Sequence, residues 1–251
     1  MAKLIIGNWK MNGDSALVTT MVAQLKPLVS SAESEAKVVL CPPFPYLGVL
    51  KEVVSGTAIG IGAQNVHTQP SGAFTGEVSV SMLQEWNTTH CIIGHSERRQ
   101  YFGETDELVH QKATLLLEKS IQPVICVGES LEQRESGQHE TTVLGQLSKA
   151  LEGMDPNQLS KCIIAYEPVW AIGTGKTATA EQANQMHSTI RQKLTTLSNE
   201  SLSRSIPILY GGSVNAKNSG ELLQQPEIDG SLVGGASLKL EDFSQIIQSC
   251  S

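Results

Sequence analysis

Short apolar runs recur eight times along the chain, and longer stretches with a helical spacing of apolar residues lie between them. The runs are residues 3–7, 37–41, 58–63, 91–94, 123–127, 162–166, 207–210 and 230–233. Most are continuously apolar rather than alternating, which is typical of strands covered on both faces in a parallel sheet. The helical stretches include residues 15–30, 105–120, 179–197 and 240–248, where apolar residues return every three or four positions.

This alternation predicts an α/β fold built from eight strand–helix units. Eight units in 251 residues match a closed (β/α)8 barrel, in which eight parallel strands are surrounded by helices. A doubly wound open sheet is the alternative, because periodicity alone does not determine whether the sheet closes. No stretch has the composition of a linker, so residues 1–251 are expected to form a single domain.

The composition and charge narrow the classes of partner. Hydrophobic residues make up 40% of the chain and charged residues 17%, which excludes disorder. The net charge is −7, and no basic cluster exceeds the pair Arg98 and Arg99, so neither nucleic acid nor an anionic membrane is expected to bind. The longest run without charge, residues 53–76, contains amides, His67 and Pro70, and is too polar to span a bilayer.

The cysteines and the N-terminus predict a location. The five cysteines are odd in number and contain no C-x-x-C pair, which argues against a disulfide framework and against a zinc site. The apolar patch at residues 4–6 is cut short by Asn8 and Lys10, so no signal peptide is expected. Both observations favour the reducing cytoplasm.

Polar residues stand where the predicted strands end. In chain order they are Asn8 and Lys10, Asn65, His95 and Glu97, Cys126 and Glu129, Glu167, Gly211–Gly212–Ser213, and Gly234–Gly235. Each of these residues alone fits a turn or a helix cap. Because chemistry in α/β folds lies beyond the carboxyl ends of the strands, the whole set predicts an active site there.

Three of these residues have side chains suited to catalysis. Lys10 supplies a cation that could attract an anionic substrate to an acidic chain. His95 lies between a strand and a predicted helix start, where the positive end of the helix dipole favours a neutral ring. Glu167 leaves an apolar strand, and partial burial would make it a stronger base.

The segment after Glu167 is interpreted as a lid. It reads Pro168, Val169, Trp170, Ala171, Ile172, Gly173, Thr174, Gly175 and Lys176. Its end looks like a phosphate-binding P-loop, but the first glycine of that motif would fall on Trp170, so the match fails. A mobile segment with an apolar tip and a hinge at residues 173–176 is the better interpretation. The glycine pairs at 211–212 and 234–235 could expose backbone N–H groups to an anion, and barrels often bind phosphate after strands seven and eight.

Over its whole length the chain resembles the triosephosphate isomerase family. The resemblance rests on residues 7–12 (GNWKMN), 62–65 (GAQN), 72–77 (GAFTGE), 94–99 (GHSERR), 165–176 (AYEPVWAIGTGK), 210–214 (YGGSV) and 233–238 (VGGASL). It implies a TIM barrel that interconverts dihydroxyacetone phosphate and glyceraldehyde 3-phosphate without a metal or an organic cofactor. Where many members have proline, this chain has Leu240, at the start of the last predicted helix.

The resemblance also implies roles for individual residues. Glu167 would remove the proton beside the carbonyl, His95 would polarise the carbonyl and move protons, Lys10 would stabilise the enediolate and phosphate charges, and Asn8 would orient the substrate. The phosphate would be held by Asn8, Lys10, Gly173, Ser213, Gly234 and Gly235. Glu97, as a buried partner of Lys10, and Cys126 would lie just behind these groups. Members are usually homodimers, in which the loop of residues 64–77, with Thr75 at its tip, lies beside the partner's active site.

Two other functions stay open at the level of the residues. A glycosidase barrel could use Glu97 and Glu167 as its pair of carboxylates, although aromatic residues make up only 4% of the chain. A phosphate-binding or scaffold protein without activity could retain the same fold. The intact set of Lys10, His95 and Glu167 disfavours the second alternative.

Overall fold

The eight predicted strands form a closed parallel barrel. The computed structural model describes residues 2–29, 36–172 and 177–250. The strands are β1 (Lys3–Asn8), β2 (Ala36–Cys41), β3 (Gly60–Ala63), β4 (His90–Ile93), β5 (Gln122–Val127), β6 (Ile163–Tyr166), β7 (Ile208–Tyr210) and β8 (Gly230–Val233). They follow one another around the barrel in chain order, and β1 pairs with β8 to close it. The (β/α)8 prediction is confirmed, and the open sheet is excluded.

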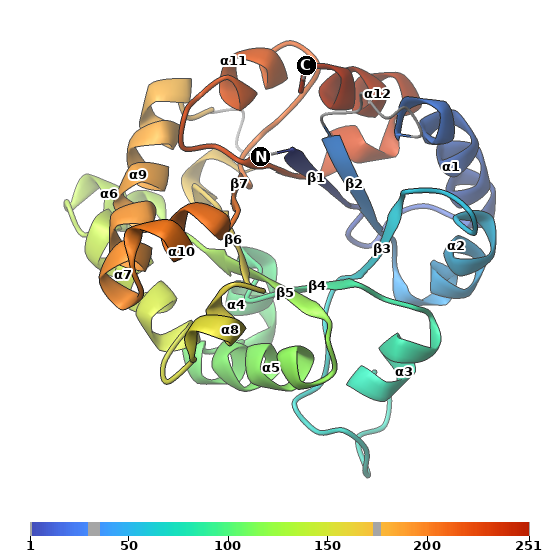
Figure 1. Ribbon diagram of the computed structural model, residues 1–251, viewed down its shortest axis with the longest axis horizontal. Coiled ribbons are helices and arrows are strands. Elements are labelled where there is room, and N and C mark those ends of the chain that lie inside the picture. Colours follow the sequence, from blue (N-terminus) through green and yellow to red (C-terminus); the bar gives the residue numbers. More distant parts are fainter. Residues whose placement is uncertain (1, 30–35, 173–176, 251) are drawn as a thin grey trace.

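Helices surround the barrel on its outer side (Figure 1). They are α1 (Ser15–Val29), α2 (Leu47–Val53), α3 (Val80–Glu85), α4 (Ser96–Phe102), α5 (Asp106–Glu118), α6 (Leu131–Glu135), α7 (His139–Ala150), α8 (Pro156–Leu159), α9 (Ala180–Leu197), α10 (Glu200–Ser205), α11 (Ser219–Leu223) and α12 (Leu240–Gln248). Short 3-10 turns lie at Phe44–Tyr46, Val169–Ala171 and Gly235–Leu238. The four helical stretches predicted from apolar spacing are α1, α5, α9 and α12.

Local caps explain where the longer helices begin. The Thr179 hydroxyl oxygen accepts the N–H of Gln182, and the Gln182 side-chain oxygen accepts the N–H of Thr179. Helix α9 therefore starts with a complete capping box. α5 has the side-chain cap alone, in which Thr105 accepts the N–H of Leu108. Each such cap stabilises its helix by about 1 kcal/mol.

The strand side chains divide into an inner and an outer layer. Successive strand residues point to opposite faces, so every second residue faces the barrel axis. The inner cluster contains Leu4, Ile6, Val39, Cys41, Ile92, Val124, Cys126, Ile163, Ala165, Leu209 and Leu232. The intervening residues pack against the helices in a larger core. Burying each large aliphatic side chain contributes about 1.5–3 kcal/mol.

The same period of two aims the first candidate residues into the barrel mouth. Leu4 and Ile6 face inward on β1, and Asn8 is the next position of that row. Ile163 and Ala165 face inward on β6, and Glu167 is the next position of that row. Both side chains are buried, with Asn8 5% and Glu167 2% exposed. The alternation that fills the core therefore also places a carboxylate and an amide at its upper end.

The segment between β3 and α3 projects beyond the ring of helices (Figure 1). Phe74, near its tip, is 45% exposed and packs against the ring of His67, 4.3 Å between centroids. Ser79 caps α3 through the N–H of Met82 and ends the projection. The loop thus carries an aromatic side chain away from the core.

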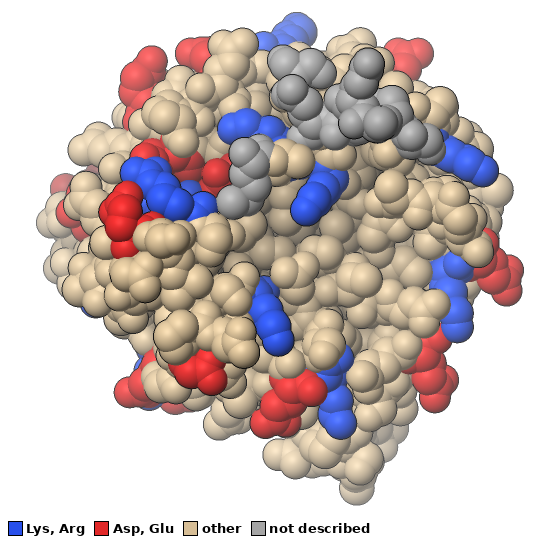
Figure 2. Space-filling view, in the orientation of Figure 1, with Lys and Arg blue, Asp and Glu red and all other residues tan. Residues whose placement is uncertain are grey.

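The surface charge and the apolarity of the helices concern two partners, nucleic acid and membranes. On the face in Figure 2, several lysine and arginine side chains are separated by uncharged surface, and others lie beside acidic ones, so no continuous basic band crosses it. Among the helices in the described part of the chain, none combines the length and apolarity needed to cross a bilayer.

Candidate active site

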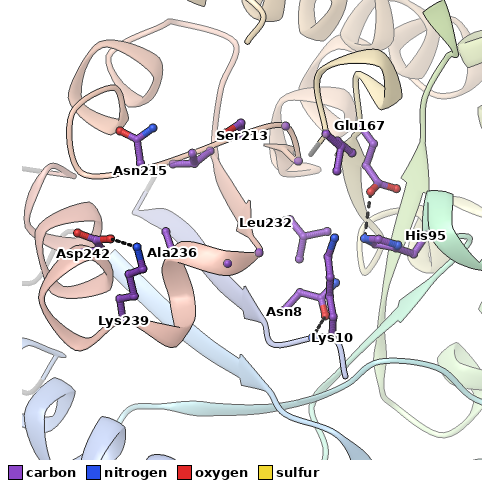
Figure 3. A pocket seen from close by; sticks show the side chains of 16 residues that line it. Asn8, Lys10, His95, Glu167, Ser213, Asn215, Leu232, Ala236, Lys239 and Asp242 are labelled. Carbon is purple, nitrogen blue, oxygen red and sulfur yellow. Dashed lines mark hydrogen bonds and ion pairs between the residues drawn. The ribbon is translucent and has the colours of Figure 1, made fainter. Parts of the chain in front are cut away.

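One cavity gathers the predicted residues at the carboxyl ends of the strands. Its volume is about 370 Å³. Asn8, Lys10, His95, Glu167, Ser213, Gly234 and Gly235 all line it. Figure 3 shows Glu167 and His95 facing each other at one end, while Asn215, Lys239 and Asp242, which sequence reasoning missed, lie at the other. The cavity is large enough for a small phosphorylated molecule and has both a reactive and a polar end.

Glu167 is held by Ser96 and faces His95. The N–H of Ser96 donates to Oε2 at 2.9 Å, and the Ser96 hydroxyl donates to Oε1 at 3.0 Å. The Nε2 atom of His95 lies 3.1 Å from Oε1. A carboxylate that is 2% exposed and lines the cavity is suited to accept a proton from carbon. Ser96 was not singled out from the sequence, because its partner lies 71 residues away.

The hydrogen bonds of His95 define its tautomer. His95 is the N-cap of α4, and its Nδ1 accepts the N–H of Glu97 at 3.2 Å. Because Nδ1 is an acceptor, the neutral ring carries its proton on Nε2, the atom that faces Glu167 and the cavity. The side chain therefore presents a hydrogen-bond donor to Glu167 and the cavity.

Lys10 adopts a strained backbone that its neighbours stabilise. Its φ is 52°, in the left-handed region, which costs on the order of 1–3 kcal/mol for a residue with a Cβ. Asn8 Oδ1 accepts the N–H of Lys10 at 3.0 Å, and Gln64 Nε2 donates to its carbonyl at 2.9 Å. Gln64 also bonds the carbonyl of Cys41 at 2.8 Å. Asn8 thus lines the cavity and also stabilises the backbone of Lys10. The contact of Gln64 with Lys10 was not predicted from the sequence.

Glu97 contacts Lys10 as expected, but it is not buried. Its Oε1 lies 2.5 Å from Lys10 Nζ, whereas its side chain is 40% exposed. The expectation of a buried partner is therefore wrong for the isolated chain. In the first turn of α4, Ser96 is the buried residue that contacts Glu167, and Glu97 lies partly exposed beside Lys10.

Cys126 lies behind Glu167 in the inner layer of the barrel. It is fully buried. Burial, together with the negative charge of Glu167, raises the pKa of its thiol well above the usual range. The thiol is therefore neutral and unreactive, and it fills space below the carboxylate.

The first part of the predicted lid is anchored to Glu129. Trp170 Nε1 donates to Glu129 Oε1 at 2.8 Å, and the Tyr166 hydroxyl donates to the same oxygen at 3.0 Å. Arg134 adds an ion pair at 3.1 Å and lies over the Trp170 ring, 4.8 Å from a ring centroid. Ile172 reaches the cavity wall. Gly173, Thr174, Gly175 and Lys176, the predicted hinge, lie outside the described residues.

The glycine pairs at 211–212 and 234–235 differ in the space that a side chain would have. A Cβ at Gly212 would lie 2.3 Å from the Tyr210 hydroxyl, and one at Gly211 would lie 3.0 Å from Glu167 Cγ, so this pair is required by close packing. A Cβ at Gly234 would meet only Lys10 Cε, at 3.6 Å, and one at Gly235 would meet nothing within 4 Å. The second pair therefore presents open backbone to the cavity, near Lys10.

Asn65, at the strand end after β3, and Glu104 belong to a hydrogen-bond network around Lys112. Asn65 accepts a bond from Lys112 at 2.8 Å, and Lys112 pairs with Glu104, also at 2.8 Å. Burial alone would raise the pKa of Glu104, but Lys112 and Arg98 together lower it. Within the described ranges, no group of three or more histidine, cysteine or acidic side chains could hold a metal ion.

The comparisons with known proteins agree on one family. Residues 3–250 match the family model described as triosephosphate isomerase. Proteins named triosephosphate isomerase from Herpetosiphon aurantiacus and Thermus thermophilus are 49% and 50% identical to the chain, over 249 and 245 residues. The aligned parts cover 98% of this chain in both cases, and 98% and 97% of the relatives. A relative of the same name from Albidiferax ferrireducens is 51% identical, with 98% of each chain covered.

Proposed function

Because the chain belongs to the triosephosphate isomerase family, we propose that Glu167, His95, Lys10 and Asn8 perform its reaction. The enzyme interconverts dihydroxyacetone phosphate and D-glyceraldehyde 3-phosphate through an enediolate, a step of glycolysis and gluconeogenesis. The observation that carries the assignment is the buried Glu167 carboxylate, 3.1 Å from a histidine nitrogen at the wall of the cavity. Replacing Glu167 by glutamine tests it, since this change keeps the shape and removes the basic oxygen.

In this proposal Glu167 and His95 divide the proton transfers. Glu167 takes the proton from the carbon beside the carbonyl and returns it to the neighbouring carbon. His95 donates its Nε2 proton toward the carbonyl oxygen, and its fixed tautomer supports that role. The bonds from Ser96 hold Glu167 before substrate arrives, so a bound substrate must draw the carboxylate away from them.

Charge and phosphate are handled by the rest of the cavity. Lys10 Nζ stabilises the enediolate oxygen and the phosphate, and the strained Lys10 backbone aims it there. Asn8 fixes that backbone and contacts substrate. Ser213 after β7, together with Gly234 and Gly235 on the open backbone after β8, binds the phosphate through N–H groups. Gly173 belongs to the same proposed set.

Residues 168–176 are proposed to cover the phosphate during the reaction. An enediolate phosphate loses inorganic phosphate if water and bond rotation are allowed, and a cover suppresses this loss. Three groups donate to the single Oε1 atom of Glu129, so this carboxylate fixes where the cover starts.

Glu129→Gln is expected to loosen that anchor, because the neutral amide oxygen is a weaker acceptor for the three donors and the NH2 group replaces Oε2, which has no hydrogen-bond partner among the described residues. Loss of one charged hydrogen bond corresponds to about a tenfold fall in kcat/KM. Assays of isomerisation and of released inorganic phosphate are expected to show slower turnover and more phosphate. Glu132→Gln, an exposed change on α6, serves as the control. Unchanged phosphate release in Glu129→Gln would refute the proposed covering role.

We also propose a homodimer in the cytoplasm. Met11, Phe74, Met82, Tyr101 and Phe102 are large apolar or aromatic side chains between 45% and 94% exposed. They follow β1, β3 and β4, so they lie on one side of the barrel, around the loop that carries Thr75. Large exposed apolar side chains that follow neighbouring strands in this way are typical of a protein interface. The five free, buried cysteines fit a reducing compartment, and cell fractionation tests that placement.

Phe102→Glu is expected to convert the dimer to a monomer, because Phe102 is 68% exposed in the single chain and a charge there costs little unless a partner covers it. Sedimentation at micromolar concentration measures the mass. Leu197→Glu on α9, where leucine is 39% exposed, is the matched control and should stay dimeric. A wild-type protein that sediments at the monomer mass with full activity would contradict the dimer.

A further inference from the structure

Gln146 on α7 forms a paired set of hydrogen bonds with the backbone of Gly128. Its Oε1 accepts the N–H of Gly128 at 2.8 Å, and its Nε2 donates to the Gly128 carbonyl at 3.1 Å. Gly128 lies one residue beyond the end of β5, where its peptide groups no longer belong to the sheet. A side-chain amide matches both the donor and the acceptor of one residue. Gln146 therefore fixes both the position and the orientation of Gly128.

Gly128 in turn lies directly against the backbone of Glu167. A Cβ placed on Gly128 would be 1.9 Å from the carbonyl oxygen of Glu167 and 3.2 Å from its Cβ. Val124 and Cys126 face the barrel interior, and Gly128 is the next inward position of that row. The space that a side chain would take is occupied by Glu167. Movement of Gly128 toward the axis therefore displaces Glu167.

Ser96 and His95 contact the carboxylate of Glu167, and the strands on either side of β6 restrain the rest of the residue. Its N–H donates to the carbonyl of Val127 at 2.8 Å, one residue before Gly128. On the other side, a Cβ at Gly211 would lie 3.0 Å from Glu167 Cγ. The backbone carbonyl, Cβ and Cγ of Glu167 thus lie between Gly128 and Gly211, which follow the two strands that flank β6. Gly211 donates its N–H to the β6 carbonyl of Tyr166 at 2.7 Å, whereas Gly128 depends on a side chain from a helix.

We infer that Gln146 is a positioning residue for the catalytic base, acting through Gly128 on Glu167. The inference rests on the proposed role of Glu167. Proton transfer from carbon requires close alignment, and a displacement of about 1 Å can cost 100-fold in rate. The proposed phosphate end of the cavity is lined by the segments after β7 and β8, whereas both side-chain hydrogen bonds of Gln146 go to Gly128, after β5. Loss of the clamp should therefore slow chemistry without weakening phosphate binding.

Gln146→Met removes both hydrogen bonds at similar length, and Gln146→Glu keeps the acceptor but places a charge against the Gly128 carbonyl. Both are expected to lower kcat about 10- to 100-fold, while the affinity for inorganic phosphate stays within about twofold of wild type. A substrate deuterated at the carbon that loses its proton should show a larger isotope effect on kcat, since a misplaced base makes proton transfer more rate-limiting. Gln122→Met is the matched control, because Gln122 bonds the Lys161 backbone at the opposite end of β5.

Glu167→Gln, measured in parallel, distinguishes a failure of the inference on Gln146 from a failure of the proposed function. If Glu167→Gln is inactive and Gln146→Met keeps wild-type kcat and isotope effect, Gln146 has no positioning role and the inference fails alone. If Glu167→Gln keeps its activity, the proposed function fails. If the Gln146 variants lose phosphate affinity in proportion to kcat, the defect is general and the inference is also overturned. A fall in kcat at constant phosphate affinity, with Gln122→Met unchanged, supports it.

Discussion

Glu167→Gln is expected to lower kcat by about 10²- to 10⁴-fold, the usual contribution of a positioned general base. Glutamine has the size of glutamate and keeps an oxygen that can accept the bond from the Ser96 N–H. Its amide cannot take a proton from carbon at neutral pH. The barrel should fold normally, because Glu167 is buried among hydrogen-bond partners that an amide can still satisfy in part.

Two measurements separate a lost base from a damaged cavity. Inorganic phosphate should bind with unchanged affinity, because Ser213, Gly234 and Gly235 lie at a different part of the cavity wall. In deuterium oxide, the wild-type enzyme should place solvent deuterium on carbon, and the variant should do so only at its residual rate. Wild-type exchange by Glu167→Gln would show that another group is the base.

Much of the fold was readable from the sequence because it depends on local pattern. Continuous apolar runs such as residues 91–94 and 123–127 gave β4 and β5, since strands covered on both faces favour apolar residues at successive positions. Closure of the sheet could not be read in this way. It depends on the pairing of β1 with β8, which are more than 200 residues apart in the chain.

The candidate site was readable to the extent that it follows strand ends. Asn8 and Glu167 continue the inward rows of β1 and β6, so the alternation that predicts the core also predicts their direction. Ser96, Gln64 and Gln146 were missed because each acts on a reactive residue through hydrogen bonds to residues between 18 and 71 positions away. Such contacts leave no periodic pattern. The exposure of Glu97 was missed for the same reason, because it depends on which neighbour occupies the inward position.

Lys10→Met is expected to lower kcat/KM by about 10²- to 10³-fold, which corresponds to the loss of one preorganised charged donor at a developing oxyanion. Both kcat and KM should worsen, since the proposed cation acts on the enediolate and on the phosphate. The substitution also leaves Glu97 without its partner, so an unpaired carboxylate near the cavity could repel an anionic substrate. The double variant Lys10→Met with Glu97→Gln removes that charge. Because Glu97 is 40% exposed and can be solvated, only a small part of the activity should return.

Lys239→Met provides the matched control at the other end of the same cavity. Lys239 is 74% exposed and lies 3.7 Å from Asp242, so solvent and salt screen its charge. Its loss should change kcat/KM by no more than a few-fold, and the difference should shrink at high ionic strength. The effect of Lys10→Met should persist in salt, because Lys10 lines the cavity and the proposal places its Nζ in direct contact with the substrate. If both lysine variants lose activity equally and both effects vanish in salt, Lys10 acts only by long-range attraction, and its assignment to the enediolate would be wrong.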